Sequence, residues 1–140
     1  MIQRVQSLWL FLAAMVNGLL CILPLYGYGN PPVVVKAQEH IILLFMAAIS
    51  ASLPMFAIFF FGNRGRQKGL TWLGIFATLA FFGLTVLEVE NQKTKNPLVS
   101  NFHYAIPGIL IAVVSIIFMI MALRGIRKDD KLIRSLDRLR

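Results

Sequence analysis

Apolar residues gather along the chain into four uninterrupted stretches that short polar segments separate. The stretches run over residues 5–25, 41–61, 70–87 and 104–123, and none contains Asp, Glu, Lys, Arg or His. A helix of about 20 apolar residues crosses the roughly 30 Å of bilayer hydrocarbon. It also satisfies its own backbone hydrogen bonds, which lipid requires. The pattern therefore predicts an all-α membrane protein with four transmembrane helices.

The first stretch has an alternative interpretation, because Arg4 followed by an apolar run resembles a secretory signal peptide. Its apolar run is longer than the usual 7–15 residues of a signal peptide, however, and no A-x-A-like cleavage site follows it. The segment after it, residues 24–32, is rich in Pro and Gly and predicts a turn. We therefore expect residues 5–25 to stay in the protein as a membrane helix.

Composition agrees with this prediction. Hydrophobic residues make up 58% of the 140 residues and charged residues 14%, whereas soluble domains average about 45–50% and about 25%. The charges are unevenly placed: 11 of the 14 Lys and Arg lie before the first stretch, between the second and third, or after the fourth. Only Lys36, Lys93 and Lys95 lie in the other two loops.

This asymmetry predicts the orientation of the chain, because basic residues that flank membrane spans are retained on the cytoplasmic side. Both termini and the middle loop should therefore be cytoplasmic. The other two loops balance three lysines with three glutamates, so the whole net charge of +8 lies on the predicted cytoplasmic side. Such a charge suits anionic lipid headgroups and gives no indication of nucleic-acid binding.

The C-terminal segment 124–140 is predicted to be a cytoplasmic amphipathic helix that continues from the fourth span, separate from the bundle of residues 1–123, with Gly125 as a candidate bend. At 100° per residue, its Leu and Ile residues form one stripe and its basic residues lie opposite. The candidate lipid- or partner-binding residues come from this helix and the middle loop: Arg127, Lys128, Lys131, Leu132, Ile133, Arg134, Leu136, Arg138, Leu139, Arg64, Arg66 and Lys68.

Two interpretations of this segment stay open and are compatible. It can lie on anionic headgroups, to which each Lys or Arg contributes about 1 kcal/mol. Alternatively, the Leu132–Leu139 stripe docks onto a partner protein of a membrane complex or of the cytoplasm, or onto the chain's own Arg64–Lys68 loop.

Polar residues within the predicted spans are few. Asn17 in the first span is expected to make an interhelical hydrogen bond, with substrate binding as the alternative. Pro54 in the second span predicts a kink, and neighbouring helices or nearby serines can satisfy the backbone group that it leaves without a donor. Gly74 and Thr78 in the third span have the small-xxx-small spacing that lets helices pack closely.

The sequence carries no catalytic signature: there is no phosphate-binding Gly-rich loop, G-x-S-x-G or C-x-x-C. His40 and His103, at predicted outward span ends, are the candidates for a metal or haem site. They come from separate loops without metal-ligand spacing, so we expect no metal, no cofactor and no enzymatic activity.

The opening MIQRVQ, the Asn63-Arg64 pair after the second span and the ending IRKDDKLIRSLDRLR resemble a bacterial membrane family of unknown function. Its members have about 140 residues, four predicted helices, an MIQR(I/V)Q start and an ending similar to IRKDE-x-LVRS-x-DRLR. The resemblance implies an integral protein of the bacterial inner membrane. It implies no activity, substrate or cofactor.

Three functional hypotheses follow from these features. The leading one is a non-enzymatic accessory or assembly subunit whose working surface is cytoplasmic. The second is a small-molecule or ion carrier, which needs a polar cavity reaching Asn17 or Ser50–Ser52. The third is a metal- or haem-binding redox subunit that uses His40 and His103.

Overall fold

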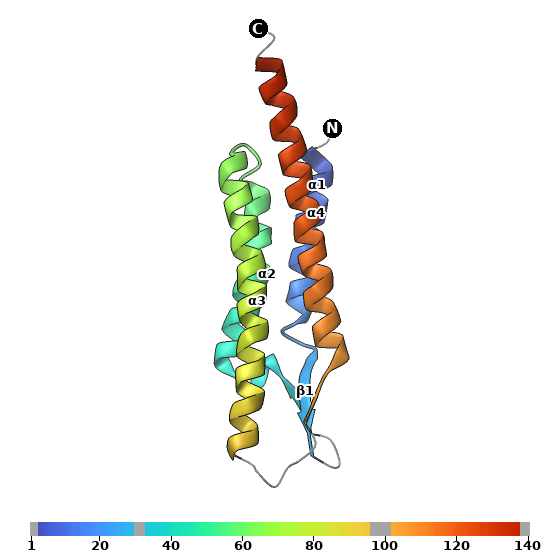
Figure 1. Cartoon of the computed structure of the whole chain (residues 1–140), viewed down its shortest axis with the longest axis vertical. Helices are drawn as coiled ribbons and strands as arrows, with labels where there is room; N and C mark the ends of the chain where they lie inside the picture. Colours follow the sequence, from blue (N-terminus) through green and yellow to red (C-terminus); the bar gives the residue numbers. More distant parts are fainter. Residues whose placement is uncertain (1–2, 30–32, 96–101, 138–140) are drawn as a thin grey trace.

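The protein is a bundle of four helices with a small sheet at one end (Figure 1). A computed structural model describes residues 3–29, 33–95 and 102–137, and the side-chain environments of all of these except residues 3, 4, 102, 104 and 133–137. The helices are α1 (Gln3–Leu19), α2 (Ile41–Phe59), α3 (Arg64–Lys95) and α4 (Ile106–Asp137). α1 packs against α2 and α4, and α3 packs against the same two helices. α1 begins and α4 ends at the same end of the bundle.

Each of the four predicted spans contains one helix, and three of these helices are long and apolar enough to cross a membrane. The fourth, α1, has a shorter apolar part, Val5–Leu19. The first span was predicted to run to Leu25, which is wrong, because the helix ends at Leu19 and a strand begins at Pro24. Hydrophobicity alone does not distinguish the end of a helix from a buried strand.

Two helices are longer than the predicted spans because charged residues end contact with hydrocarbon without ending a helix. The third span was predicted as residues 70–87, yet α3 has 32 residues and extends about 48 Å at 1.5 Å per residue. α4 also has 32 residues and passes through Gly125 as continuous helix. The segment that begins at residue 124 therefore belongs, as far as Asp137, to the same helix as the preceding apolar span.

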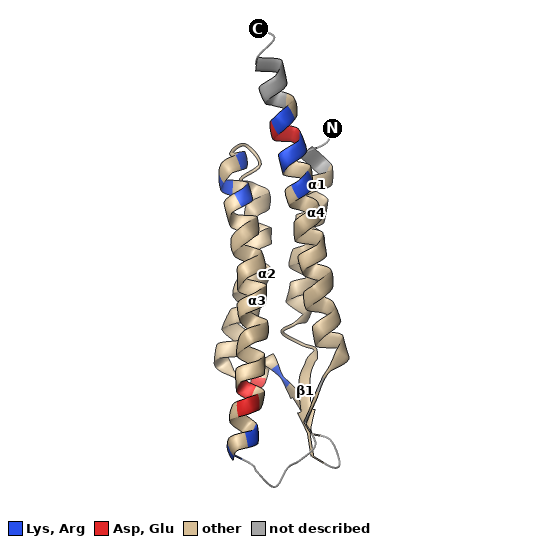
Figure 2. Ribbon diagram, viewed as in Figure 1, with Lys and Arg blue, Asp and Glu red and all other residues tan. Residues whose placement is uncertain are grey.

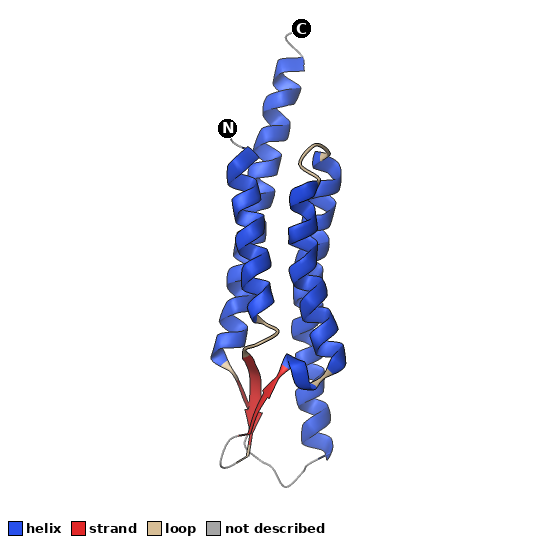
Figure 3. Ribbon diagram, turned by 180° about the vertical axis from the view of Figure 1, so that it is seen from behind, coloured by secondary structure: helices blue, strands red, loops and turns tan. Residues whose placement is uncertain are grey.

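A three-stranded antiparallel sheet joins the two loops at the other end of the bundle (Figure 3). Its strands are β1 (Pro24–Tyr28), β2 (Val33–Lys36) and β3 (Phe102–Tyr104), in the order β2-β1-β3. Tyr26 lies opposite Val35 on one side and Tyr104 on the other. The prediction of an all-α fold is therefore incomplete.

Large apolar side chains cover the outside of the bundle. Ile41, Phe59 and Phe76 are among the most exposed, with 70%, 71% and 59% of their surface accessible. A soluble monomer rarely exposes a large continuous apolar surface, whereas lipid surrounds such a surface without cost. Together with the three long apolar helices, this makes the chain a multi-pass membrane protein.

The buried face of α3 is a seam in which small or polar residues alternate with apolar ones, mostly at intervals of three or four positions: Gln67, Thr71, Gly74, Ile75, Thr78, Phe81, Thr85 and Val89. Three of its threonines, at residues 71, 78 and 85, donate their hydroxyls to carbonyls of their own helix four residues earlier. Gly74 faces Pro54 of α2 and Met119 of α4. The close-packing face predicted at Gly74 and Thr78 is thus confirmed.

Asn17 connects the helices at the level of Pro54. Proline has no N–H, so Pro54 cannot donate to the carbonyl of Ser50 four residues earlier. The Asn17 Nδ2 atom of α1 donates to that carbonyl at 2.9 Å and to Thr78 Oγ1 of α3 at 3.2 Å. The expected interhelical hydrogen bond of Asn17 is therefore confirmed, and a neighbouring helix supplies the donor that α2 lacks.

This arrangement predicts that Asn17 and Pro54 are energetically coupled. Replacing Asn17 by Leu should lower the free energy of unfolding by about 1–2 kcal/mol, because the Ser50 carbonyl then lies in an apolar bundle without a donor. In a Pro54→Ala background, the introduced alanine supplies the helical N–H to the Ser50 carbonyl. Asn17→Leu should then lower the free energy of unfolding by clearly less. Unfolding of the four purified variants in mixed micelles measures the coupling as a double-mutant cycle. An equal cost of Asn17→Leu in both backgrounds would contradict it.

Candidate functional site

The charged residues lie at the two ends of the bundle, and the middle is free of them along the described helices (Figure 2). We call the end where α1 begins and α4 ends the basic end, and the opposite end the sheet end. The basic end exposes Arg66, Arg124, Arg127, Lys128 and Lys131. The sheet end carries glutamates together with lysines.

At the basic end, a buried hydrogen bond joins the first helix to the last. Gln6 Nε2 of α1 donates to Asp129 Oδ2 of α4, and both side chains are almost completely buried. Gly125, one turn before Asp129, makes room for this contact, since a Cβ atom there would lie 2.8 Å from Gln6 Cγ. The opening and closing motifs of the chain therefore meet in space.

A second contact joins α3 to α4 at the same end. Lys68 Nζ lies 2.6 Å from Asp130 Oδ2, and both side chains are about three-quarters buried. The segment after the fourth span thus contacts the Arg64–Lys68 region through an ion pair between Lys68 and Asp130. Sequence reasoning had placed both residues on the same side of the membrane, but nothing in the sequence indicated that they pair.

The predicted binding residues are only partly described. Arg127, Lys128 and Lys131 are exposed on α4, Arg66 is exposed on α3, Arg64 is half-buried, and Leu132 is 46% exposed. The side chains of Ile133, Arg134, Leu136, Arg138 and Leu139 lie outside the described part, so docking of the apolar stripe stays a prediction. A cleft of about 300 Å³ between α3 and α4 is lined by Lys68, Arg127, Asp130 and Lys131.

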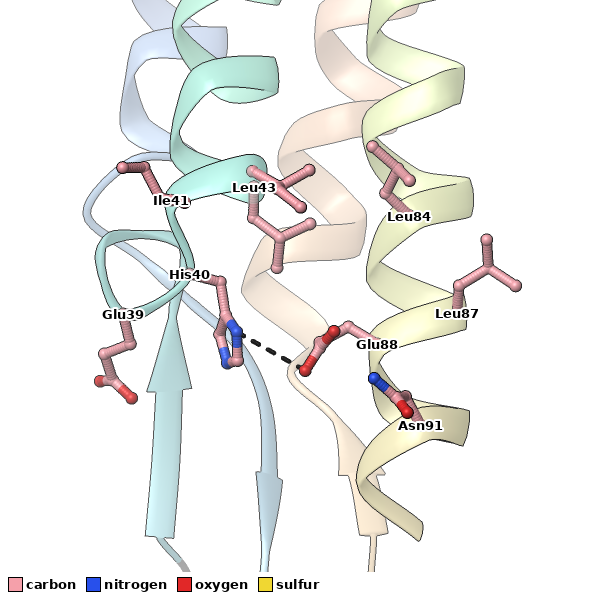
Figure 4. Close-up of a pocket in the computed structure, with 9 residues that line it drawn as sticks. Glu39, His40, Ile41, Leu43, Leu84, Leu87, Glu88 and Asn91 are labelled. Carbon is pink, nitrogen blue, oxygen red and sulfur yellow. Dashed lines mark ion pairs between the residues drawn. The ribbon is translucent and has the colours of Figure 1, made fainter. Parts of the chain in front are cut away.

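The sheet end holds a larger open pocket of about 540 Å³ between α2 and α3 (Figure 4). Its apolar wall and polar rim are formed by Glu39, His40, Ile41, Ile42, Leu43, Leu84, Leu87, Glu88 and Asn91. His40 Nδ1 lies 3.5 Å from Glu88 Oε1, and the dashed line in the figure marks this pair. The Glu39 carboxylate points away from the His40–Glu88 pair.

Tyr26 of β1 completes this contact from below the pocket. Its hydroxyl lies 3.3 Å from His40 Nε2, so His40 bridges the sheet and α3 through its two ring nitrogens. Burial, and secondarily the negative charge of Glu88, raises the pKa of Tyr26 to about 12. Tyr26 is therefore a neutral hydrogen-bonding group at physiological pH and is unsuited to act as a nucleophile or base.

The two histidines lie in different settings. His40 contacts Tyr26 and Glu88, whereas His103 is an exposed residue of β3 whose backbone partner is Gly27. Within residues 3–29, 33–95 and 102–137, no group of three or more His, Cys, Asp or Glu side chains is arranged to hold a metal ion. Sequence reasoning named His40 as a residue at a span end, but its pairing with Glu88 and the contribution of Tyr26 required the fold.

Comparison with known proteins gives one match. A family model described as Domain of unknown function (DUF4293) matches residues 2–139. The chain belongs to this family. No curated protein and no solved structure matches it. The resemblance to an uncharacterised family is thereby confirmed, and membership of DUF4293 assigns no activity to either end of the bundle.

Gly125 provides a test of the contact between the two motifs. Gly125→Ala should lower the free energy of unfolding by about 1–3 kcal/mol, because the new methyl group displaces Gln6 from Asp129. Gly83→Ala is the matched control: Gly83 is also helical, and a Cβ atom there would meet nothing within 4 Å. The control should be neutral or slightly stabilising, since Ala favours helix over Gly. Equal thermal unfolding temperatures of the two purified variants would show that Gln6 does not need the space at Gly125.

Proposed function

We propose that the chain is a non-enzymatic accessory or assembly subunit of a bacterial inner membrane, with the basic end as its cytoplasmic working surface. The observation that supports this proposal most strongly is the different use of acids and bases on α4. Asp129 and Asp130 turn toward Gln6 and Lys68, while Arg127, Lys128 and Lys131 remain at the surface. The last part of α4 therefore presents positive charge outward.

The surface of the basic end suits two kinds of contact. Exposed Lys and Arg beside a membrane span attract anionic headgroups, which favours anchoring of the helix at the bilayer surface. In addition, Leu132 begins the predicted apolar stripe and is 46% exposed, which favours contact with a protein. In an accessory subunit, the contact with anionic headgroups would hold the protein-binding surface in place.

The carrier hypothesis has less support. It needs a polar cavity that reaches Asn17, whose side chain is fully buried and whose amide nitrogen is bonded to Ser50 and Thr78. The groove on the outer surface near Ser52 is lined mainly by Ala, Met and Phe side chains of α1 and α2. The redox hypothesis has no specific observation in its favour.

The proposed orientation is tested by labelling single cysteines in intact cells. In a Cys21→Ala background, which removes the only native cysteine, Lys95→Cys should react with a membrane-impermeant maleimide. Lys128→Cys should react only after permeabilisation, because the basic end is expected in the cytoplasm. Both residues are exposed, so access to the side chain does not limit either reaction. The reverse pattern would overturn the charge argument.

Site-specific photo-crosslinking tests the partner surface. A crosslinker at Lys128 or Leu132 of the full chain in its membrane should give one protein adduct of defined mass. The same residue placed at Val113, which is 49% exposed on the apolar part of α4, should label lipid. Replacing Arg127 and Lys131 by Gln should abolish the protein adduct. Labelling of lipid alone at all three positions would leave membrane anchoring as the only role of this surface and would refute the accessory role.

A further inference from the structure

The pocket at the sheet end crosses the boundary between apolar and polar surface. Ile41 and Ile42 in the first turn of α2 are 70% and 64% exposed, and Leu87 of α3 is 65% exposed. Glu88 follows Leu87 directly, and Asn91 lies one helical turn further from the apolar span. A molecule in this pocket would therefore meet hydrocarbon-like side chains on one side and hydrogen-bonding groups on the other.

The rim of the pocket is acidic. Among the residues that line it, Glu39 and Glu88 are carboxylates and none is Lys or Arg. His40 is the only lining group that can gain a positive charge, and it is held by Tyr26 and Glu88. Such a rim attracts a positively charged, hydrogen-bond-donating group and repels phosphate or carboxylate placed at the same point.

Size and composition narrow the class of ligand further. A volume of about 540 Å³ lies within the range of small-molecule sites. Five of the nine lining residues are Ile or Leu. Such a lining is unsuitable for a bare inorganic cation, since hard cations require several oxygen ligands. An amphiphile with a cationic head and a hydrocarbon chain matches both halves of the pocket.

We propose that this pocket binds an amphiphile with a primary ammonium head, such as an ethanolamine phospholipid. The ammonium group donates to the Glu88 carboxylate at the rim, while the hydrocarbon chain lies along Leu87 and Ile42. Gln92 Nε2 donates to Glu88 Oε1 at 2.9 Å and His40 Nδ1 lies 3.5 Å from the same oxygen, so the carboxylate is held in place before the ligand arrives. The site lies at the other end of the bundle from the proposed cytoplasmic surface and does not depend on it.

Native mass spectrometry of the full-length protein in mixed micelles tests the proposal. The probes are phosphatidylethanolamine, phosphatidylcholine, whose quaternary ammonium cannot donate a hydrogen bond, and phosphatidylglycerol, which has no amine. The wild-type protein should bind the ethanolamine lipid about tenfold more tightly than the other two, as one charge-assisted hydrogen bond would require. Equal binding of the three lipids would overturn the proposal.

Variants then locate the site. Glu88→Gln should remove the preference for ethanolamine, whereas Glu90→Gln should keep it, because Glu90 is on the same helix but is exposed and pairs with Lys93 outside the pocket. Leu87→Trp fills the pocket from an exposed position without disturbing the core, and should weaken binding of the ethanolamine lipid. This variant tests the site independently if Glu88→Gln does not fold. Unchanged binding of the ethanolamine lipid by Leu87→Trp, or dimers of the protein in place of lipid adducts, would refute the site.

Discussion

The bundle depends on one constraint of the lipid environment, which is that every backbone polar group must find a partner inside the protein. Pro54 breaks this rule within α2, since it removes the donor for the Ser50 carbonyl. Asn17 repairs the break from α1 and reaches Thr78 of α3 with the same amide group. One proline thus explains why a fully buried asparagine lies in the apolar second half of α1, and it links three helices at this level.

Close packing along α3 follows from the same constraint. The hydroxyls of its threonines donate hydrogen bonds to carbonyls of the same helix. Neighbouring helices can therefore pack against these small side chains without leaving their hydroxyl donors unsatisfied. Gly74 lies against Pro54 of α2 and Met119 of α4, and a Cβ atom there would come within 3.5 Å of both side chains. Between lipid-covered helices, such packing and a few hydrogen bonds take the place of the hydrophobic effect. The central part of the described bundle is therefore packed without charged side chains, which lie at its two ends.

Much of this architecture was predictable from the sequence. The four apolar stretches and the asymmetry of Lys and Arg depend on composition over long windows, and lipid penalises violations of both patterns strongly. The end of α1 at Leu19 and the three strands were not predictable, because they depend on pairing between distant loops. The length of α3 was not predictable from hydropathy either, because the helix continues through charged residues. The contact of Gln6 with Asp129 joins residues 123 positions apart. Similarly, the pocket at the sheet end required the spatial neighbourhood of His40 and Glu88, which hydropathy does not encode.

The contacts at the basic end change the interpretation of the terminal motifs. The sequence of the C-terminal segment left two interpretations open, anchoring on lipid headgroups and docking onto a partner, and anchoring alone needs only positive charge. In the structure, Asp129 and Asp130 bind Gln6 and Lys68 of the same chain, so part of that pattern is explained by folding. Gln6, the last residue of the opening MIQRVQ, has the same explanation, because it is the donor to Asp129. What internal folding leaves unexplained is the set of exposed basic side chains from Arg124 to Lys131, and the proposed contact with a partner or an anionic headgroup is therefore narrowed to this surface.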